Sequence, residues 1–365
     1  MLNNKKIAVV VPAFNEEKQI GFVLNTIPSF VDRIIVVDDC STDNTISVVK
    51  NCIKEDTNAR QEIKAFSPPI INSPYNRANT LVYEHREKEF AYFVPFEILN
   101  QDPDHEKIIL VRHKKNGGVG ASIACGYKWC LDHAIDCVAV MAGDGQMDPS
   151  ELESLVRPVV DEGVDYVKGN RLIHRSAWLL IPKIRFLGNA ILSILTKIAS
   201  GYWRVSDTQC GYTAISLKAL QAIRLYRIYR RFGMPNDLLV KLNIAYCTIR
   251  EVEVKPVYGI GENSKMRIFK VIPSISWLLC ICFIKRVWGK YFFRDFHPIF
   301  LFYQFAFIMG IFLCPYTLKI AGLVLKNQNV SFETLMAFIF LAISSFQALF
   351  FAMWMDIQDN ERLYK

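Results

Sequence analysis

The chain has 365 residues, of which 52% are hydrophobic and 13% aromatic, and its 43 Lys and Arg residues outnumber 35 Asp and Glu residues. These values exclude a disordered chain, a collagen-like repeat and a small disulfide-rich scaffold. The apolar residues are unevenly distributed, because the longest uncharged stretches lie near the C-terminus.

The first 265 residues alternate strand and helix patterns. Apolar runs at 7–11 and 33–37 predict buried strands, and the apolar spacing within 16–27 predicts a helix between them. Further strands are expected at four places, the last of them alternating as an edge strand does: 107–112, 137–141, 166–168 and 250–254. This order predicts an α/β domain with a mainly parallel sheet, whose ligands bind beyond the carboxyl ends of the strands.

The pattern fails over residues 53–106, where five prolines and many charges interrupt any periodicity. A connection of this length is unusual inside a compact domain. We interpret it as an insertion, and a passive surface element is favoured over a lid.

Two stretches combine apolar and basic residues before the C-terminal region. Residues 268–284 are mostly apolar, are flanked by Lys and Arg and contain Pro273, which leaves a run too short to span a bilayer. They predict an amphipathic helix in the membrane interface, with a buried connector helix as the alternative. Residues 182–200 have a similar character.

Two uncharged runs follow, at 299–318 and 335–355, and each has about the 20 residues that cross a bilayer. We predict a transmembrane hairpin rather than two buried core helices. Lys285, Arg286, Lys290 and Arg294 precede the first run, so the positive-inside tendency places the N-terminal domain on the cytoplasmic side. No N-terminal signal peptide is expected. The predicted domains are 1–265, an interfacial segment 266–296, the hairpin 297–355 and a cytoplasmic tail 356–365.

Four polar clusters follow predicted strands, at 12–17, 38–45, 116–121 and 143–148. Each alone has an ordinary structural explanation: Ser41, Asp43, Asp144 or Asp148 caps a helix, and the glycines of the third cluster permit a tight turn.

Together the clusters carry a resemblance. The stretches VPAFNEE, VVDDCSTDNT, NGGVGASIACGY and MAGDGQMDP, in this order, resemble the family 2 glycosyltransferases, which have the GT-A fold. Three later stretches, KGNR at 168–171, DTQCGYT at 207–213 and NSK at 263–265, are similar to the branch of dolichyl-phosphate mannose synthases and other polyprenyl-phosphate glycosyltransferases. The resemblance covers residues 5 to about 270, apart from the insertion.

The resemblance implies a donor site and a metal. The residues that it assigns to the nucleotide sugar are Pro12, Phe14, Asn15, Glu16, Asp38, Asp39, Asn116, Gly118, Ala142 and Asp144. Asp144 and Gln146 match the family's metal motif, in which oxygen ligands suit Mg²⁺ or Mn²⁺. The chain departs from the family's DxD pattern at Ala142, where one acid is missing, so metal binding is expected to rely on Asp144, Gln146 and the diphosphate or to be weaker.

The resemblance also implies an acceptor side. Asp207 matches the acid near the point of sugar transfer, where it orients the sugar or stabilises developing charge, and Asp237 is the rival acid, needed if the acceptor were a hydroxyl. The predicted catalytic residues are therefore Asp144, Asp207 and Asp237. The residues expected to bind the acceptor phosphate are Arg171, Arg185, Asn189 and Lys265, and the alternative for the cations is attraction to anionic lipids.

These features predict an integral membrane glycosyltransferase that moves one hexose-type sugar, with inversion, from a UDP- or GDP-sugar to dolichyl or polyprenyl phosphate. Transfer to a hydroxyl acceptor, such as a polysaccharide or glycolipid, is the alternative within the enzyme class. A non-catalytic nucleotide-sugar-binding membrane protein is the alternative outside it. A nucleic-acid partner is not expected because the cations gather near the membrane segments, and the sequence is compatible with a homo-oligomer.

Overall fold

The computed structural model describes residues 2–56, 62–66, 73–181, 183–258 and 268–365. An eight-stranded sheet runs through these residues in the order β3-β4-β2-β1-β5-β7-β6-β8. The strands are β1 (Ile7–Ala13), β2 (Arg33–Asp38), β3 (Phe96–Ile98), β4 (Ile108–His113), β5 (Cys137–Val140), β6 (Tyr166–Asn170), β7 (Thr213–Ser216) and β8 (Ile249–Glu253). The α/β fold class is thus confirmed.

Four neighbouring strands determine where the site lies. β4, β2, β1 and β5 are parallel, with Val10 of β1 opposite Ile35 and Val140. Their carboxyl ends therefore share one edge, which carries the four polar clusters. β8 is an edge strand, as its alternating pattern predicts. β7 was not expected from the sequence, and it pairs antiparallel with both β5 and β6.

Helices cover both faces of the sheet. The α-helices of the described residues are α1 (Ile20–Thr26), α2 (Thr45–Glu55), α3 (Arg77–Glu89), α4 (Val119–Asp132), α5 (Leu152–Glu162), α6 (Ala177–Leu180), α7 (Lys183–Ser200), α8 (Leu217–Ala222), α9 (Met234–Ile244), α10 (Ile268–Trp288), α11 (Pro298–Leu325) and α12 (Phe332–Glu361). One apolar core lies between the sheet and α4, α8 and α9, and a second lies between the sheet and α1, α2 and α5. The N-terminal helix is shorter than predicted, because it begins at Ile20 rather than residue 16.

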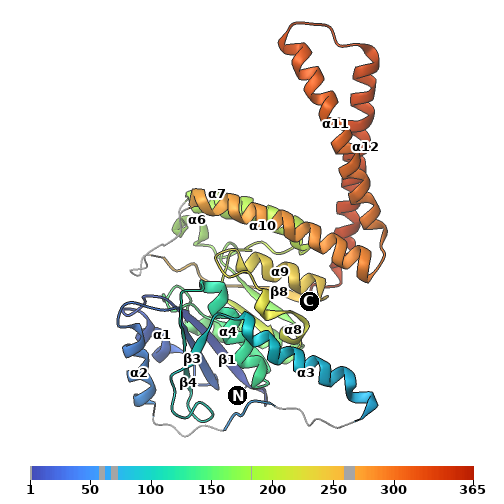
Figure 1. The fold of residues 1–365 in the computed structure, drawn as a ribbon. Helices are drawn as coiled ribbons and strands as arrows, with labels where there is room; N and C mark the ends of the chain where they lie inside the picture. The colour runs from blue at the N-terminus through green and yellow to red at the C-terminus, as the bar shows by residue number, and fades with distance from the viewer. Residues whose placement is uncertain (1, 57–61, 67–72, 182, 259–267) are drawn as a thin grey trace.

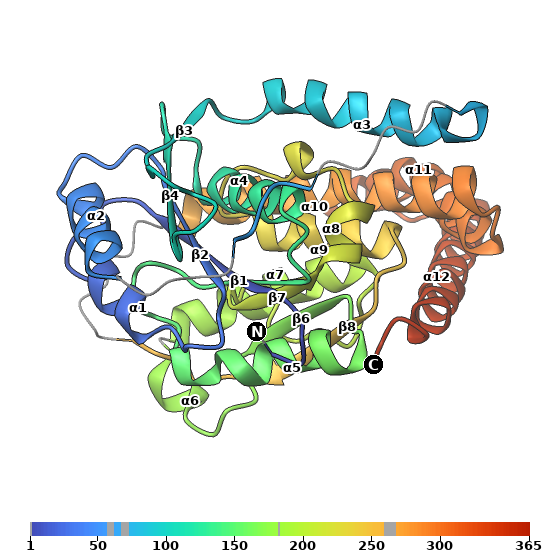
Figure 2. The ribbon, with the colours of Figure 1, turned by 90° about the horizontal axis from the view of Figure 1, so that it is seen from below.

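The insertion adds elements to the surface and to the sheet. Helix α3 has no buried residue and lies along the outside of the domain (Figure 2). Strand β3 pairs antiparallel with β4 and so extends the sheet at one edge. Its position agrees with an insertion, and a lid function stays untested.

Helices α7 and α10 form a layer above α9, which we call the platform (Figure 1). Helix α10 continues through Pro273, so this proline does not interrupt the helix. The platform exposes large apolar side chains although it belongs to a folded domain: Trp277 is 68% exposed, Leu187 63% and Ile194 58%. Exposed apolar side chains of this size are typical of a surface that meets another apolar phase.

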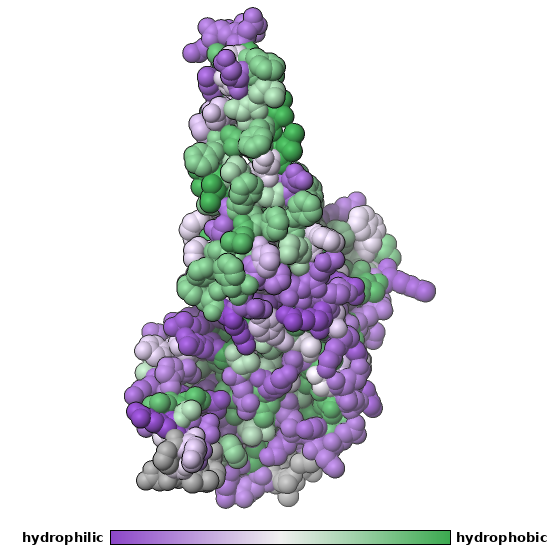
Figure 3. Space-filling model, turned by 90° about the vertical axis from the view of Figure 1, so that its right-hand side faces the viewer, coloured by the Kyte–Doolittle hydropathy of each residue, from purple (hydrophilic) through white to green (hydrophobic). Residues whose placement is uncertain are grey.

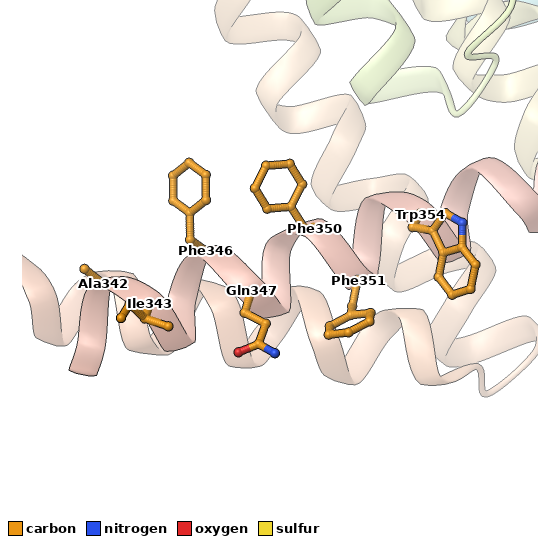
Figure 4. Close-up of a pocket in the computed structure, with 7 residues that line it drawn as sticks. All are labelled: Ala342, Ile343, Phe346, Gln347, Phe350, Phe351 and Trp354. Atoms are coloured by element: carbon orange, nitrogen blue, oxygen red, sulfur yellow. The ribbon is translucent and has the colours of Figure 1, made fainter. Parts of the chain in front are cut away.

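Helices α11 and α12 project from the domain as a hairpin (Figures 1 and 3). Both are long and apolar enough to cross a membrane, and most of their apolar side chains face outwards. An apolar groove on α12 runs past Phe346, Phe350 and Trp354, and none of the predicted site residues lines it (Figure 4). The predicted hairpin therefore has the required dimensions.

A buried polar network joins the hairpin to the domain. Arg286 of α10 makes two hydrogen bonds to Asp356 of α12, at 2.7 and 2.8 Å, and both side chains are fully buried. Lys290 is also buried and lies 3.0 Å from Asp359. Two of the four cations that precede the first apolar run are thus internal, and of these four only Lys285 and Arg294 are exposed.

The C-terminal segment differs from the predicted tail. Helix α12 continues to Glu361, and Leu363 is buried in the core that contains α4 and α9. Tyr364 forms a β-bridge with Ile249. Residues 356–365 therefore belong to the folded domain, because their polar groups pair with α10 and their apolar groups fill the core.

Candidate active site

The loops that follow β1, β2 and β5 are tied together at the carboxyl edge of the sheet. The backbone N–H of Asn15 donates to Ser41 Oγ at 2.9 Å, and the Asn15 side-chain oxygen accepts from the backbone of Thr42 at 2.8 Å. The N–H of Gly143 donates to the carbonyl of Pro12 at 3.2 Å. Three of the four predicted clusters are thus in direct contact. Phe14 and Glu16 lie in the same loop as Asn15 and are half-buried.

Asp39 connects the fourth cluster to this group. Its carboxylate accepts from the backbone N–H groups of Gly117 and Gly118, each at 2.7 Å, and lies 2.7 Å from Nδ1 of His113. The Asn116 side chain donates to the Asp39 carbonyl at 3.2 Å. Asp39, Asn116 and Gly118, which are predicted to bind the nucleotide sugar, are therefore brought together, and the Asp39 carboxylate fixes the glycine loop.

The glycines of this loop allow a close backbone approach. The N–H of Gly120 donates to the carbonyl of Arg230 at 2.8 Å. A Cβ on Gly120 would lie 2.0 Å from the carbonyl oxygen of Tyr229. The first turn of α4 is thus covered by the chain around residue 230, and only glycine fits at the contact.

Asp38 has an unused hydrogen-bonding atom. Its Oδ2 accepts from the N–H of Ser41 at 3.1 Å, but its buried Oδ1 has no partner among the described residues. An unsatisfied buried acceptor is costly, so it indicates a position where a ligand donor completes the site.

The predicted metal motif lies on the turn after β5. Asp144 Oδ1 accepts from the N–H of Gln146 at 3.0 Å, and the Gln146 amide nitrogen donates to the carbonyl of Val257 at 3.4 Å. Ala142 contributes only its N–H, to the sulfur of Met147. The described residues contain no group of three or more His, Cys, Asp and Glu that would hold a metal alone.

On the predicted acceptor side, Arg171 and Asp207 form a bidentate ion pair. The guanidinium donates Nε to Oδ2 at 2.8 Å and Nη2 to Oδ1 at 3.0 Å. The backbone N–H groups of Arg171 and Cys210 also donate to this carboxylate. The Asp207 side chain is 1% exposed and the Arg171 side chain 23%, so only the cation reaches solvent.

The pKa of Asp207 reflects this environment. Burial opposes ionisation of the carboxyl, but the charge and hydrogen bonds of Arg171 outweigh it and lower the pKa below its ordinary value of 3.8. Asp207 is therefore an anion at neutral pH and is poorly suited to accept a proton. Burial also lowers the pKa of the neighbouring Lys168, whose amino group donates to the carbonyl of Cys210.

The loop that carries Asp207 is held against the platform. Thr208 and Ser193 of α7 share a hydrogen bond of 3.1 Å. Gln209 donates to the side-chain oxygen of Asn236 in α9, and Thr196 of α7 donates to the same oxygen. The acceptor-side ion pair is therefore connected to the surface from which the hairpin projects.

The rival acid Asp237 is engaged elsewhere. It accepts from the N–H of Tyr229 at 2.8 Å, pairs with Lys241 and lies 3.7 Å from the sulfur of Cys282. No described hydrogen bond joins it to Asp207. Its contacts are those of an acid near the N-terminus of α9.

The other predicted acceptor residues are less defined. Asn189 is half-buried on α7. Arg185 lies on the same helix, but its side chain is outside the part of the structure that is described, as is the whole of Lys265. Their contact with a phosphate stays a prediction.

Two residues of the site were missed by the sequence analysis. His113 lies at the end of β4 beside Asp39, and its position directly after a buried strand was the available signal. Glu251 on β8 accepts from the backbone of Ser206 and Asp207. In sequence it is one charge in an alternating strand, so nothing distinguishes it from an exposed residue.

Comparison with known proteins shows the family of the chain. The sequence profile of "Glycosyl transferase family 2" matches residues 8–63 and 97–224, about half of the chain. The chain belongs to this family and is a glycosyltransferase. The unmatched stretch between the two parts falls inside the predicted insertion.

Curated relatives include glycosyltransferases that use dolichyl phosphate. A UDP-N-acetylglucosamine–dolichyl-phosphate N-acetylglucosaminyltransferase of Methanococcus voltae is 27% identical over 70% of this chain and 87% of its own length. A dolichyl-phosphate beta-glucosyltransferase of Trichomonas vaginalis is 24% identical over 77% of this chain and 74% of its own. Among solved structures, glucosyl-3-phosphoglycerate synthase of Mycobacterium tuberculosis with UDP has a TM-score of 0.46 and 17% identity, and the match covers 78% of this chain and 80% of that one.

Proposed function

We propose that this glycosyltransferase transfers one sugar from a UDP-sugar to the phosphate of a polyprenyl or dolichyl phosphate at the cytoplasmic surface of a membrane. The observation that carries the proposal is the Arg171–Asp207 pair, whose cation is partly exposed and whose acid lies on a loop hydrogen-bonded to the platform. A guanidinium offers phosphate oxygens two parallel N–H groups, which a hydroxyl acceptor would not need.

The donor side supports a nucleoside diphosphate sugar. The unused Oδ1 of Asp38 accepts an N–H or O–H donor, and a uracil ring and a ribose each carry one. A GDP-sugar offers the same kinds of donor, so the choice of UDP rests on the Methanococcus relative. Pro12, Phe14, Asn15 and Glu16 are the residues that we assign to the rest of the nucleoside pocket.

The oxygen atoms of the metal motif fit a divalent cation that is shared with the diphosphate. The amide nitrogen of Gln146 donates to Val257, which leaves the amide oxygen as a ligand beside the Asp144 carboxylate. Mg²⁺ commonly takes one or two protein oxygens and completes its shell with phosphate and water, so a missing acid at Ala142 does not prevent binding. When bound, the ion neutralises charge on the leaving diphosphate.

The chemical step needs no strong base. An ionised oxygen of the lipid phosphate attacks the anomeric carbon, the bond from that carbon to the diphosphate oxygen breaks, and UDP leaves with the electron pair. The configuration inverts because attack and departure occur on opposite faces. Arg171 holds the attacking phosphate, and the ionised Asp207 holds the Arg171 guanidinium in place.

The platform and hairpin support a reaction at a bilayer. With α11 and α12 across the membrane, the exposed Trp277 and Leu187 of the platform would lie in the interface, where amphipathic helices bind. The polyprenyl chain would remain in the lipid while its phosphate enters between the platform and Arg171. Lys285 and Arg294 are the exposed cations near the anionic headgroups.

A hydroxyl acceptor is less well supported. That reaction needs a base to remove the hydroxyl proton, and Asp237 is the remaining candidate. Because Asp237 already accepts from Tyr229 and Lys241, it is occupied as a structural acid.

The test is a transfer assay with the full chain in liposomes. Radiolabelled UDP-N-acetylglucosamine, UDP-glucose and GDP-mannose are offered with Mg²⁺ or Mn²⁺, and either polyprenyl phosphate or the matched polyprenol is the acceptor. We expect organic-extractable label only with the phosphate and a UDP-sugar, and its loss with EDTA. Equal transfer to the polyprenol would refute the proposed acceptor, and transfer from GDP-mannose alone would refute the proposed donor.

Two variants locate the reaction. Asp144→Asn should lower transfer at least tenfold while raising the concentration of metal required, because a neutral amide binds a divalent cation more weakly than a carboxylate. Asp148→Asn is the matched control, since Asp148 follows the motif but caps the next helix through Ser150. If both variants behaved alike, Asp144 would not be a metal ligand.

A further inference from the structure

Glu251 connects the two segments that carry the acceptor-side ion pair. Its Oε1 accepts from the backbone N–H of Ser206 at 2.8 Å and of Asp207 at 3.1 Å. Its Oε2 accepts from the side-chain amide of Asn170 at 2.8 Å. One carboxylate on β8 therefore binds the loop before Asp207 and the end of β6.

Asn170 extends this connection around Arg171. Its side-chain oxygen accepts from the N–H of Leu172 at 2.9 Å, while its side-chain nitrogen donates to Glu251. Arg171 lies between these two anchored residues and pairs with Asp207. Both members of the ion pair are thus fixed at the backbone by groups that lead to Glu251.

This arrangement leaves the Nη1 edge of the Arg171 guanidinium available to a ligand. Nε and Nη2 are directed at Asp207, whereas no hydrogen bond involves Nη1 among the described residues. A rotation of the Arg171 backbone would change the direction of this edge and the position of the loop at Asp207 together. Precise orientation matters because a small misplacement of a bound reactant slows a reaction strongly.

We propose that Glu251 is a positioning residue, which fixes the Arg171–Asp207 pair in the orientation that receives the phosphate of the acceptor. The proposal rests on the proposed function and adds to it the residue that sets the geometry of acceptor binding. Glu251 acts through Asn170 and through the backbone of Ser206 and Asp207, and it does not contact the donor site described above.

The first variant is Glu251→Gln. Glutamine has nearly the same shape and retains one oxygen for Ser206 and Asp207, but its NH₂ group then faces the NH₂ group of Asn170. Two donors cannot pair, so the end of β6 is released. We expect the KM for polyprenyl phosphate to rise about tenfold, the size of one lost charged hydrogen bond, with the KM for the UDP-sugar unchanged.

The second variant restores the pairing with reversed roles. In Asn170→Asp/Glu251→Gln, the new amide donates to the new carboxylate, whose other oxygen still accepts from Leu172. The total charge is the same as in the wild type. We expect the KM for the acceptor to return to within about threefold of the wild-type value. Asn170→Asp alone places two carboxylates together and should be at least as impaired as Glu251→Gln.

Glu253→Gln is the matched control, because Glu253 is an exposed acid on the same strand and should behave as the wild type. Thermal unfolding and UDP binding are measured for every variant. A merely structural role for Glu251 would lower thermal stability and raise both KM values, and such a result would overturn the inference. The inference would also be overturned if the acceptor KM of Asn170→Asp/Glu251→Gln did not return toward the wild-type value.

Measurements on the wild-type chain distinguish failure of the positioning role from failure of the proposed function. If the wild type transfers sugar to polyprenyl phosphate and Glu251→Gln has an unchanged acceptor KM, only the positioning role is wrong. If the wild type transfers sugar to a hydroxyl acceptor and not to polyprenyl phosphate, both the proposed function and the positioning role are wrong.

Discussion

The ion pair between Arg171 and Asp207 permits a quantitative prediction, because removing either partner leaves the other charge buried. Asp207→Asn keeps the shape of the side chain but leaves the Arg171 guanidinium without its anion. Breaking a buried pair in this way typically costs 3 to 5 kcal/mol, and the 23% exposure of Arg171 lets water compensate partly. We therefore expect Asp207→Asn to lower the free energy of unfolding by about 3 kcal/mol.

Arg171→Met should cost at least as much, roughly 3 to 5 kcal/mol, because the carboxylate of Asp207 is 1% exposed and keeps only two backbone donors. The double variant has no unpaired charge, so its loss should be smaller than the sum of the two single losses by about 2 kcal/mol. All three variants should transfer sugar to polyprenyl phosphate at least tenfold more slowly than the wild type.

The assay is urea unfolding of the domain in detergent, followed by tryptophan fluorescence, with the free energy obtained by linear extrapolation. Arg157→Met on α5 is the matched control, because Arg157 pairs with Glu153 and Asp161 at the surface, where its loss should leave the free energy of unfolding nearly unchanged. If the losses from Asp207→Asn and Arg171→Met were additive, the two side chains would not interact in solution, and our description of the acceptor side would be refuted.

Three further predictions concern stability. Asp356→Ala leaves Arg286 buried without its anion and should lower the free energy of unfolding by about 3 to 5 kcal/mol. Lys285→Ala at an exposed position is the control and should change it by less than about 0.5 kcal/mol. Similar urea midpoints for the two variants would contradict the buried network. Gly120→Ala should destabilise by about 1 to 3 kcal/mol because the added Cβ meets the Tyr229 carbonyl, and an unchanged thermal midpoint would show that the contact is absent. The pKa of Asp207 is lower in the folded chain, so its stabilising contribution is present above about pH 4 and is lost as the pH falls through the folded pKa. The difference in urea midpoint between wild type and Asp207→Asn should therefore be constant from about pH 7 to 5 and shrink below about pH 4. A difference that already shrinks at pH 6 would show that the pKa of Asp207 is not lowered by folding.

Several features of the protein could be predicted from the sequence because their signals are local. The strands at 7–11 and 33–37 and the hairpin runs each show their pattern within about 20 residues, and burial or length then determines the element. The clusters after parallel strands share one edge of the sheet, so their proximity follows from the strand order.

Other features could not be predicted, because they depend on pairs of residues that are far apart in the chain. Arg286 and Asp356 are separated by 70 residues, and Asn170 and Glu251 by 81. In sequence, Arg286 and Lys290 resemble cations that flank a membrane segment. Only the return of α12 to the domain provides Asp356 and Asp359, which pair with these cations inside the protein. A charged side chain can be buried only where the fold provides an opposite charge that offsets the loss of water.

The amino-acid sequence by itself thus determined the α/β domain, the family and the apolar hairpin, since these depend on periodicity and on short motifs. The tertiary structure decided which acids of those motifs are engaged: Asp39 and Asp237 are occupied by protein groups, whereas one oxygen of Asp38 has no partner among the described residues. It also decided that Asp207 is paired with Arg171 and that Glu251 supports both. Such assignments require the positions of all hydrogen-bonding partners, which only the folded chain brings together.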